Sequence, residues 1–297
     1  MASVRAPAFC LARKLSVLTL LLAAGVGAAK EPPLSLTPSG AWVMNYAPDS
    51  CHLARTFGEG DQAVSIEFRK FSPSDRFELL VAGKTLASQR TDVLVTEFGP
   101  GGGPEQHPNA LQGQMSDGRT VLEMTAMFFP KDEKAQRSWK AEQDPAPLDT
   151  EAEARITELR ISGPIPRPLV FQLGPMGKPL DAMRACLDEL MTHWGIDAAA
   201  HHSLTRAAAP ASNPQNWISP GYFPENMLKQ HRSGTVHFRL MVDTQGKPTG
   251  CVVQTGDDAF NNLTCTALMK RARFTPALDA NGKPISSYYA NAVHWLG

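Results

Sequence analysis

The chain has 297 residues, which is long enough for two domains. Its 29 basic and 29 acidic side chains balance, so there is no overall positive field that would recruit nucleic acid or anionic lipid. We therefore expect a globular protein without a nucleic-acid partner.

Residues 1–29 are typical of an export signal. Basic side chains precede an apolar run from Leu15 to Val26, and the small residues Gly27, Ala28 and Ala29 follow it as a cleavage region. The apolar run is shorter than the roughly 20 residues that a membrane span needs. We predict export with cleavage, and a retained N-terminal anchor over residues 15–29 is the alternative.

Residues 30–196 predict a β-rich N-terminal domain. Val64, Ile66 and Phe68 alternate with polar residues, which is the period of a strand with one buried face. Clusters of Gly, Pro, Asp and Ser separate further strand-like runs, namely Phe77–Ala82, Asp92–Phe98, Arg119–Phe129, Arg155–Ser162 and Pro168–Leu173. Many short strands without helical patterns between them favour an antiparallel barrel or sandwich. The polar stretch from Asp132 to Asp149 is expected to be a long excursion.

One helix is predicted at the end of this domain. Pro179 suits a first helical position, and Gly195 suits a helix stop. Between them lies an apolar stripe, which we interpret as core: Leu180, Met183, Leu187, Leu190 and Trp194. Residues 197–216 are rich in Ala, contain two prolines and are predicted to be an interdomain linker.

Residues 217–297 predict a second, smaller α+β domain. An alternating strand from Val236 to Val242 is followed by turn residues and a second strand through Cys251. A helix is expected over Ala259–Ala272, capped by Asp257 or Asp258 and stopped before Pro276. A closing strand is expected over Ile285–Leu296. A sheet of three strands covered by one helix can bury a single small core.

Four cysteines remain after removal of the export signal, and an even number in an exported chain favours disulfides. Four cysteines allow three pairings. We favour Cys251–Cys265, because a residue on the second strand and a residue on the covering helix can lie close together. That choice leaves Cys51–Cys186, and buried free thiols are the alternative. Zinc is not expected, because no two cysteines have the close spacing of a structural zinc site.

The C-terminal segment resembles the C-terminal domain of the TonB family over residues 221–296. The matching features are Gly221-Tyr222-Phe223-Pro224 before a short helix, Gly234 before the first strand, and Arg273-Phe274-Thr275-Pro276-Ala277 after the helix. The order strand, strand, helix, strand is also that of the family. The resemblance implies a periplasmic binding module of a Gram-negative bacterium that acts in transmembrane transport and has no catalytic group.

The resemblance also implies a mode of binding. In the family, the sheet edge at the last strand receives an extended segment of an outer-membrane transporter, which is strand addition. Here that edge is Ser286–Trp295, and the side chains expected to contact a partner are Ser286, Tyr288, Tyr289, His294 and Trp295. The alternative for each of these side chains is that it faces the core of the sheet.

Energy transduction is less well supported than binding. A full transducer of the family keeps its N-terminal helix in the inner membrane, with a His in that helix and a long Pro-rich spacer after it. Here Ser16–Leu22 contain no His, and a β-rich domain replaces the spacer. We therefore expect an exported binding protein, with a membrane-anchored transducer as the alternative. Cell-wall contact and self-association through an exposed edge strand are further possibilities for its partners.

The sequence shows little sign of catalysis. It has no G-x-S-x-G, no H-E-x-x-H and no phosphate-binding G-x-x-x-x-G-K-[ST] motif. Ser50, Cys51 and His52 are adjacent, but neighbouring residues of a strand point to opposite faces and make no nucleophile–base pair. His193, His201 and His202 have no Asp, Glu or Cys at regular spacing. We expect no cofactor and no metal, and keep an enzymatic N-terminal domain as the second alternative.

Overall fold

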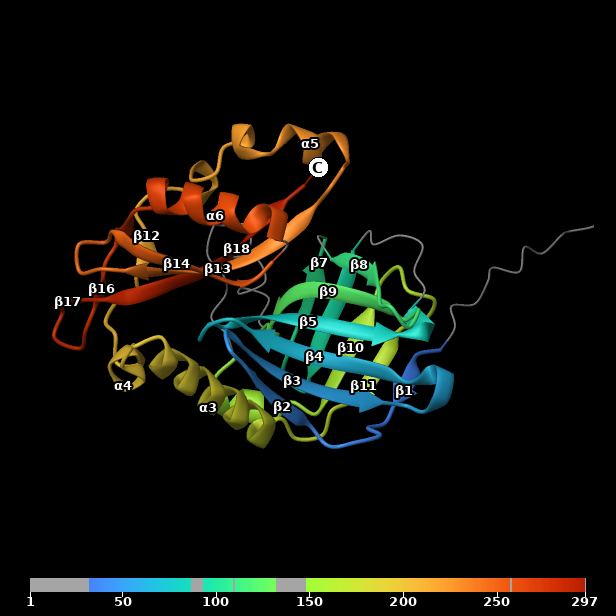
Figure 1. Ribbon diagram of the computed structural model, residues 1–297. Coiled ribbons are helices and arrows are strands. Elements are labelled where there is room, and N and C mark those ends of the chain that lie inside the picture. Colours follow the sequence, from blue (N-terminus) through green and yellow to red (C-terminus); the bar gives the residue numbers. More distant parts are fainter. Residues whose placement is uncertain (1–31, 87–92, 109, 132–147, 257, 297) are drawn as a thin grey trace, which may run out of the picture. The chain divides into compact units, whose positions relative to one another are not determined.

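The computed structural model describes residues 32–86, 93–108, 110–131, 148–256 and 258–296 (Figure 1). Residues 32–297 form one compact unit. The predicted export signal and residues 132–147 of the polar excursion lie outside the described residues. No helix in the described part of the chain is both long enough and apolar enough to span a membrane.

Two sheets make up the N-terminal β region, which we define as residues 32–196. The larger sheet is antiparallel and has the order β2 (Val43–Ala47), β3 (Ser50–Phe57), β4 (Val64–Lys70), β5 (Arg76–Gly83), β9 (Thr120–Met127) and β8 (Leu111–Gln114). The smaller sheet has the order β1 (Leu34–Leu36), β11 (Leu169–Gln172), β10 (Glu158–Ser162), β6 (Leu94–Gly99) and β7 (Pro104–His107). In the smaller sheet β1 and β11 are parallel, and the other pairs are antiparallel.

The two sheets share one core. Alternate residues of β4 and β6 are buried, as period-two patterning requires. Phe68 of β4 and Phe77 of β5 lie 6.0 and 5.9 Å from the ring of Phe98 of β6. Phe57 of β3 lies 5.4 Å from Phe171 of β11. The described strands therefore form two sheets packed face to face and not a closed barrel.

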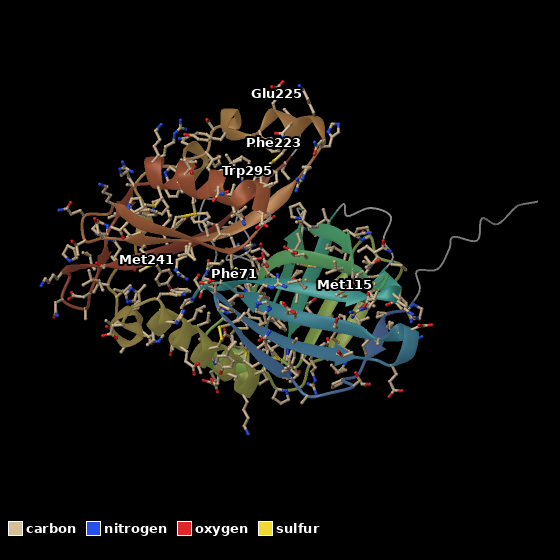
Figure 2. The ribbon with its side chains drawn as sticks, in the orientation of Figure 1. Phe71, Met115, Phe223, Glu225, Met241 and Trp295 are labelled. Carbon is tan, nitrogen blue, oxygen red and sulfur yellow. A yellow bond between two sulfur atoms is a disulfide. The ribbon has the colours of Figure 1, made fainter. Side chains whose placement is uncertain are left out.

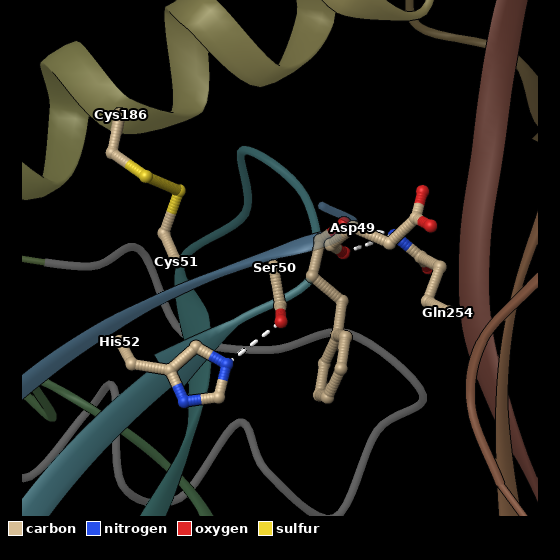
Figure 3. The surroundings of a disulfide bond; sticks show 7 residues. Asp49, Ser50, Cys51, His52, Cys186 and Gln254 are labelled. Atoms are coloured by element: carbon tan, nitrogen blue, oxygen red, sulfur yellow. Dashed lines mark hydrogen bonds between the residues drawn. A yellow bond between two sulfur atoms is a disulfide. The ribbon is translucent and has the colours of Figure 1, made fainter. Parts of the chain in front are cut away.

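Helix α3 (Gly177–His193) closes this region, and the short helix α2 (Thr150–Ala154) precedes it. The apolar stripe of α3 is buried in the core shared by the sheets. The helix ends where the sequence predicts, because Gly195 takes a left-handed φ of 76°. A disulfide joins Cys186 of α3 to Cys51 of β3 (Figure 3).

Residues 197–216 carry regular structure of their own. They contain α4 (Ala198–His202), the two-residue strand β12 (Ala209–Pro210) and the short 3₁₀ helix η3 (Pro214–Asn216). β12 pairs with β15 of the C-terminal segment. The division of the chain into domains around this segment stays a prediction.

The C-terminal segment has the predicted order of elements. Its sheet has the order β14 (Pro248–Thr255), β13 (Gly234–Val242) and β18 (Ser287–Trp295), all antiparallel, and α6 (Asp258–Arg271) packs on it (Figure 1). The smaller elements are η4 (Pro220–Tyr222), α5 (Glu225–Lys229), β15 (Phe274–Thr275), β16 (Ala277–Leu278) and β17 (Pro284–Ile285). The second disulfide joins Cys251 of β14 to Cys265 of α6.

Two apolar clusters lie between α6 and this sheet, and α6 contributes Leu268 to one and Phe260 to the other. In one, Trp217 and Tyr289 pack against Phe274 at ring distances of 5.3 and 5.1 Å. In the other, Phe223 and Trp295 lie beside each other at 5.7 Å (Figure 2). Gly246 occupies the turn between β13 and β14 with a φ of 77°, and a Cβ there would lie 1.9 Å from the carbonyl oxygen of Phe274. Only glycine fits that turn.

The two disulfides are expected to differ in their contribution to stability. Cys51 and Cys186 are 135 residues apart, whereas Cys251 and Cys265 are 14 apart. In the chain-entropy model, loops of these lengths correspond to about 5 and about 3 kcal/mol. We predict that the double substitution Cys51→Ala/Cys186→Ala lowers the free energy of unfolding more than Cys251→Ala/Cys265→Ala, by about 2 kcal/mol in urea titrations. A larger loss from the second pair would contradict the role given to α3.

Candidate protein-interaction site

Strand β13 is buried on both faces. Val236, Phe238 and Leu240 face the α6 side and are at most 2% exposed. Arg239 lies on the opposite face and is 6% exposed. A strand with polar residues at alternate positions usually exposes them to water. Here the polar face packs on the N-terminal β region instead.

Arg239 makes the strongest of these contacts. Its Nη1 donates to Oδ1 of Asp49 at 3.0 Å, and its guanidinium lies 4.0 Å from the ring centre of Trp194. Burial lowers the pKa of Arg239, and the hydrogen bond and charge of Asp49 oppose that shift. Because an Arg side chain stays protonated in proteins, the pair is a charged contact supported by an aromatic face.

His237 and Gln254 extend the same contact. His237 Nε2 lies 2.6 Å from Oε1 of Glu78, and its ring stacks on Phe71 at 4.0 Å. The Gln254 side chain donates to the main-chain oxygens of Asp49 and Phe71 at 3.0 and 2.6 Å, and Figure 3 shows it beside Asp49. The turn after β2 and the end of β4 are thus fixed against the C-terminal sheet.

The start of β18 packs on α3 and α4. Tyr288 lies 5.2 Å from the ring of Trp194 and is stacked 5.9 Å from His201. His201 Nε2 hydrogen-bonds with the Ser287 hydroxyl at 2.9 Å. Burial raises the pKa of Tyr288 to about 12, so its phenol is neutral at physiological pH. His202 Nε2 lies 2.9 Å from Oδ1 of Asp188.

The second edge of β18 is open. Among the described residues, β18 pairs with β13 alone. In an antiparallel ladder, residues alternate between bonding to the partner strand and pointing their main-chain groups away from it. The amide of Ala292 donates to Oδ1 of Asn291 at 2.8 Å, which places Ala292 in the outward set. The same set then includes Tyr288, Ala290 and His294.

A groove runs along this open edge. A hollow of about 430 Å³ borders Ala290, Asn291 and Ala292, and one of about 300 Å³ borders the strand from Ser287 to Ala290. The two hollows share Ala290 on β18, and they share Ser72 and Ser74 on the connection between β4 and β5. We call the two together the edge groove.

The five residues predicted to contact a partner fall into different environments. Ser286 is exposed just before β18, and His294 is exposed near its end, bonded to the Thr235 hydroxyl at 3.0 Å. Tyr288 and Tyr289 border the smaller hollow. Trp295 is 4% exposed, stacks on Phe260 and donates to the Thr264 hydroxyl. The side chain of Trp295 belongs to the core, so it can take part in a strand-addition site only through its main chain.

Ser50 and His52 make a contact that their positions in the sequence did not lead us to expect. Residues two apart on a strand share a face, and the Ser50 hydroxyl hydrogen-bonds with Nε2 of His52 at 2.7 Å (Figure 3). His52 Nδ1 bonds in turn to Glu67 at 2.8 Å. This is the connectivity of a nucleophile, base and carboxylate. Ser50 is only 6% exposed, however, and neither it nor His52 borders the edge groove. We interpret the hydrogen-bonded chain Ser50–His52–Glu67 as part of the packing of the sheet face.

Comparison with known families gives an independent assignment for the end of the chain. Residues 219–296 match the family model of the Gram-negative bacterial TonB protein C-terminal. This TonB-like module covers about a quarter of the chain. The family is a non-enzymatic protein-interaction domain, and the match leaves the N-terminal part unassigned. Searches of curated proteins and of solved structures found no match.

The residues that the sequence did not reveal are those that join the TonB-like module to the rest. His237 and Arg239 alternate with apolar residues, and this pattern by itself indicates a solvated face. The partner of Arg239 is 190 residues away in the sequence.

We predict that Arg239→Leu lowers the free energy of unfolding by about 2–4 kcal/mol, because Asp49 loses its counter-charge in a half-buried position. The control is Arg271→Leu. Arg271 is exposed on α6 and lies 5.2 Å from the ring of Tyr222, so its loss should cost less than about 1 kcal/mol. Urea titrations of both variants measure the two losses in the free energy of unfolding. Equal losses would show that the contact with Asp49 contributes nothing specific.

Proposed function

We propose that this protein is an exported binding protein whose TonB-like module takes up an extended segment of a partner protein along β18. The open edge of β18, bordered by a groove, is the observation that carries this proposal. The N-terminal β region packs on one face of the module's sheet and α6 covers the other, which leaves the two edge strands β14 and β18, and of these the groove borders β18.

Main-chain bonding supplies the affinity in this mode of binding, and alternate side chains supply the selectivity. The outward residues Tyr288, Ala290 and His294 offer both a donor and an acceptor to an added strand, whereas Ala292 offers its carbonyl, because its amide donates to Asn291. Two alanines at the centre leave room for the incoming chain. The half-buried side chain of Tyr289 and the buried side chain of Trp295 hold the strand rigid, which lowers the entropy that binding must remove.

The partner and the location follow from the family. A TonB-like domain implies a periplasmic location in a Gram-negative bacterium, where an outer-membrane transporter is the first candidate partner. The export signal at residues 1–29 supports that location. Cell-wall contact and pairing of β18 with a second copy are secondary candidates. A membrane-anchored energy transducer is the alternative function, and it requires residues 15–29 to be retained.

We predict that Ala290→Pro weakens peptide binding about tenfold, because proline removes one outward main-chain donor worth about 1–1.5 kcal/mol. The probe is the tightest peptide selected from a phage-displayed library of random linear dodecapeptides against the mature chain. Affinity is measured by fluorescence anisotropy.

Ala290→Ser is the matched control, since it keeps the donor and nearly the same size. Its affinity should equal that of the unaltered protein, and melting curves establish that both variants fold. Unchanged binding by a folded Ala290→Pro protein would rule out strand addition at β18.

A further inference from the structure

The smaller hollow of the edge groove lies beside the first half of β18. Ser287, Tyr288, Tyr289 and Ala290 border it. This part of β18 has no strand partner on its outer side among the described residues. A segment that bonds to the outward main-chain groups of Tyr288 and Ala290 therefore passes directly beside the hollow.

The rest of the lining comes from parts of the chain that precede the TonB-like module. Met191 belongs to α3, Leu204 and Ala207 follow α4, and Pro73 lies between β4 and β5. The match to the family begins at residue 219 and includes none of these four residues. A preference that they impose on a ligand is thus a property of this chain and does not follow from the family.

The smaller hollow offers no counter-charge to a ligand. Its lining contains no Asp, Glu, Lys or Arg among the described residues. Its two imidazoles have other partners, since His201 bonds to the Ser287 hydroxyl and His202 lies 2.9 Å from Oδ1 of Asp188. A charged side chain that entered this hollow would lose water without gaining an ion pair, which is unfavourable.

The buried part of the lining suits an apolar side chain. Met191 is 1% exposed, and Ala208 is 9% exposed. Ser287 is also buried, and its hydroxyl is bonded to His201. Methionine is unbranched and flexible, so it adapts to the shape of the group that packs on it. The hollow measures about 300 Å³, and an apolar cavity of about 150 Å³ is enough to hold benzene. A side chain as large as that of Phe therefore has room.

We propose that the smaller hollow is a selectivity pocket that takes one large apolar side chain, Leu, Met or Phe, from the segment added to β18. The inference rests on the proposed function, because it names the chemistry of the partner at the same groove. We call the side chain in the pocket the anchor. A shift of the added strand by one residue turns every side chain to the other face, so the anchor fixes the register of the segment as well as its affinity.

The test is to repeat the dodecapeptide selection on the mature chain and on its Ala207→Trp variant. Ala207 is exposed and borders the hollow, so an indole at this position should fill the pocket without entering the core. The unaltered protein should enrich peptides that share a Leu, Met or Phe at one position, and Ala207→Trp should lose this preference. Ala199→Trp is the matched control, because Ala199 is an exposed alanine of α4 that borders neither hollow.

Affinities then measure the contribution of the anchor. In the best peptide, exchange of the anchor for Ala should weaken binding at least tenfold to the unaltered protein and to Ala199→Trp, because burial of a large apolar side chain is lost. The same exchange should leave binding to Ala207→Trp unchanged, as a double-mutant cycle. Fluorescence anisotropy gives the affinities, and melting curves establish that each variant folds.

A methyl resonance locates the anchor. With ¹³C-methyl methionine in the mature chain, a peptide whose anchor is Phe should shift the resonance of Met191, because the ring lies against that methyl group. The same peptide with Leu as its anchor should give a smaller shift. Met115 is the internal control, because it is 40% exposed and borders neither hollow.

The outcomes separate the two proposals. If Ala290→Pro weakens binding but the selected peptides share no apolar anchor, or the anchor contributes equally in Ala207→Trp, the inference about the smaller hollow is wrong and strand addition stands. A Met191 resonance that does not respond to a Phe anchor would also contradict the inference. If Ala290→Pro weakens no selected peptide, strand addition and the inference both fail.

Discussion

Burial of Arg239 on β13 is the constraint on which the rest of the structure depends. An isolated buried charge costs several kcal/mol unless a counter-charge accompanies it. Asp49 supplies that charge to Arg239, and Glu78 Oε1 lies 2.6 Å from Nε2 of His237. Both carboxylates come from the N-terminal β region, so the C-terminal sheet is covered on both faces. The two sheet edges remain, and the groove lies along that of β18.

The long-range disulfide supports the same contact. Cys51 lies two residues after Asp49, and Cys186 lies on α3, which Trp194 follows as its C-cap residue. Trp194 packs against both the Arg239 guanidinium and the Tyr288 ring. The Cys51–Cys186 disulfide therefore links the turn that contains Asp49 to α3, and both of these contact the TonB-like module. Oxidising conditions, as in the periplasm, would preserve this arrangement.

The sequence predicted the features that local patterns specify. The apolar stripe of α3 and the glycine after it predicted the bounds of this helix to within about two residues. The alternating strand pattern, followed by a helix with a capping residue, predicted the order of the C-terminal elements. The cysteine pairing followed from placing Cys251 on a strand and Cys265 on its covering helix. A barrel and a sandwich share the same period-two pattern, so the sequence could not separate them. The contact of Arg239 with Asp49 and the two-residue strand β12 leave no periodic signal, and the edge groove depends on both parts of the chain.

Amide hydrogen exchange at single-residue resolution, with and without a selected peptide, tests strand addition on β18 most directly. If a peptide adds to this edge, the amides of Tyr288, Ala290 and His294 become slower to exchange on binding. Those of Tyr289, Asn291 and Val293, already bonded toward β13, change little. Slowing that is confined to β14, or that follows no alternation along β18, would contradict the assignment of this edge as the binding site.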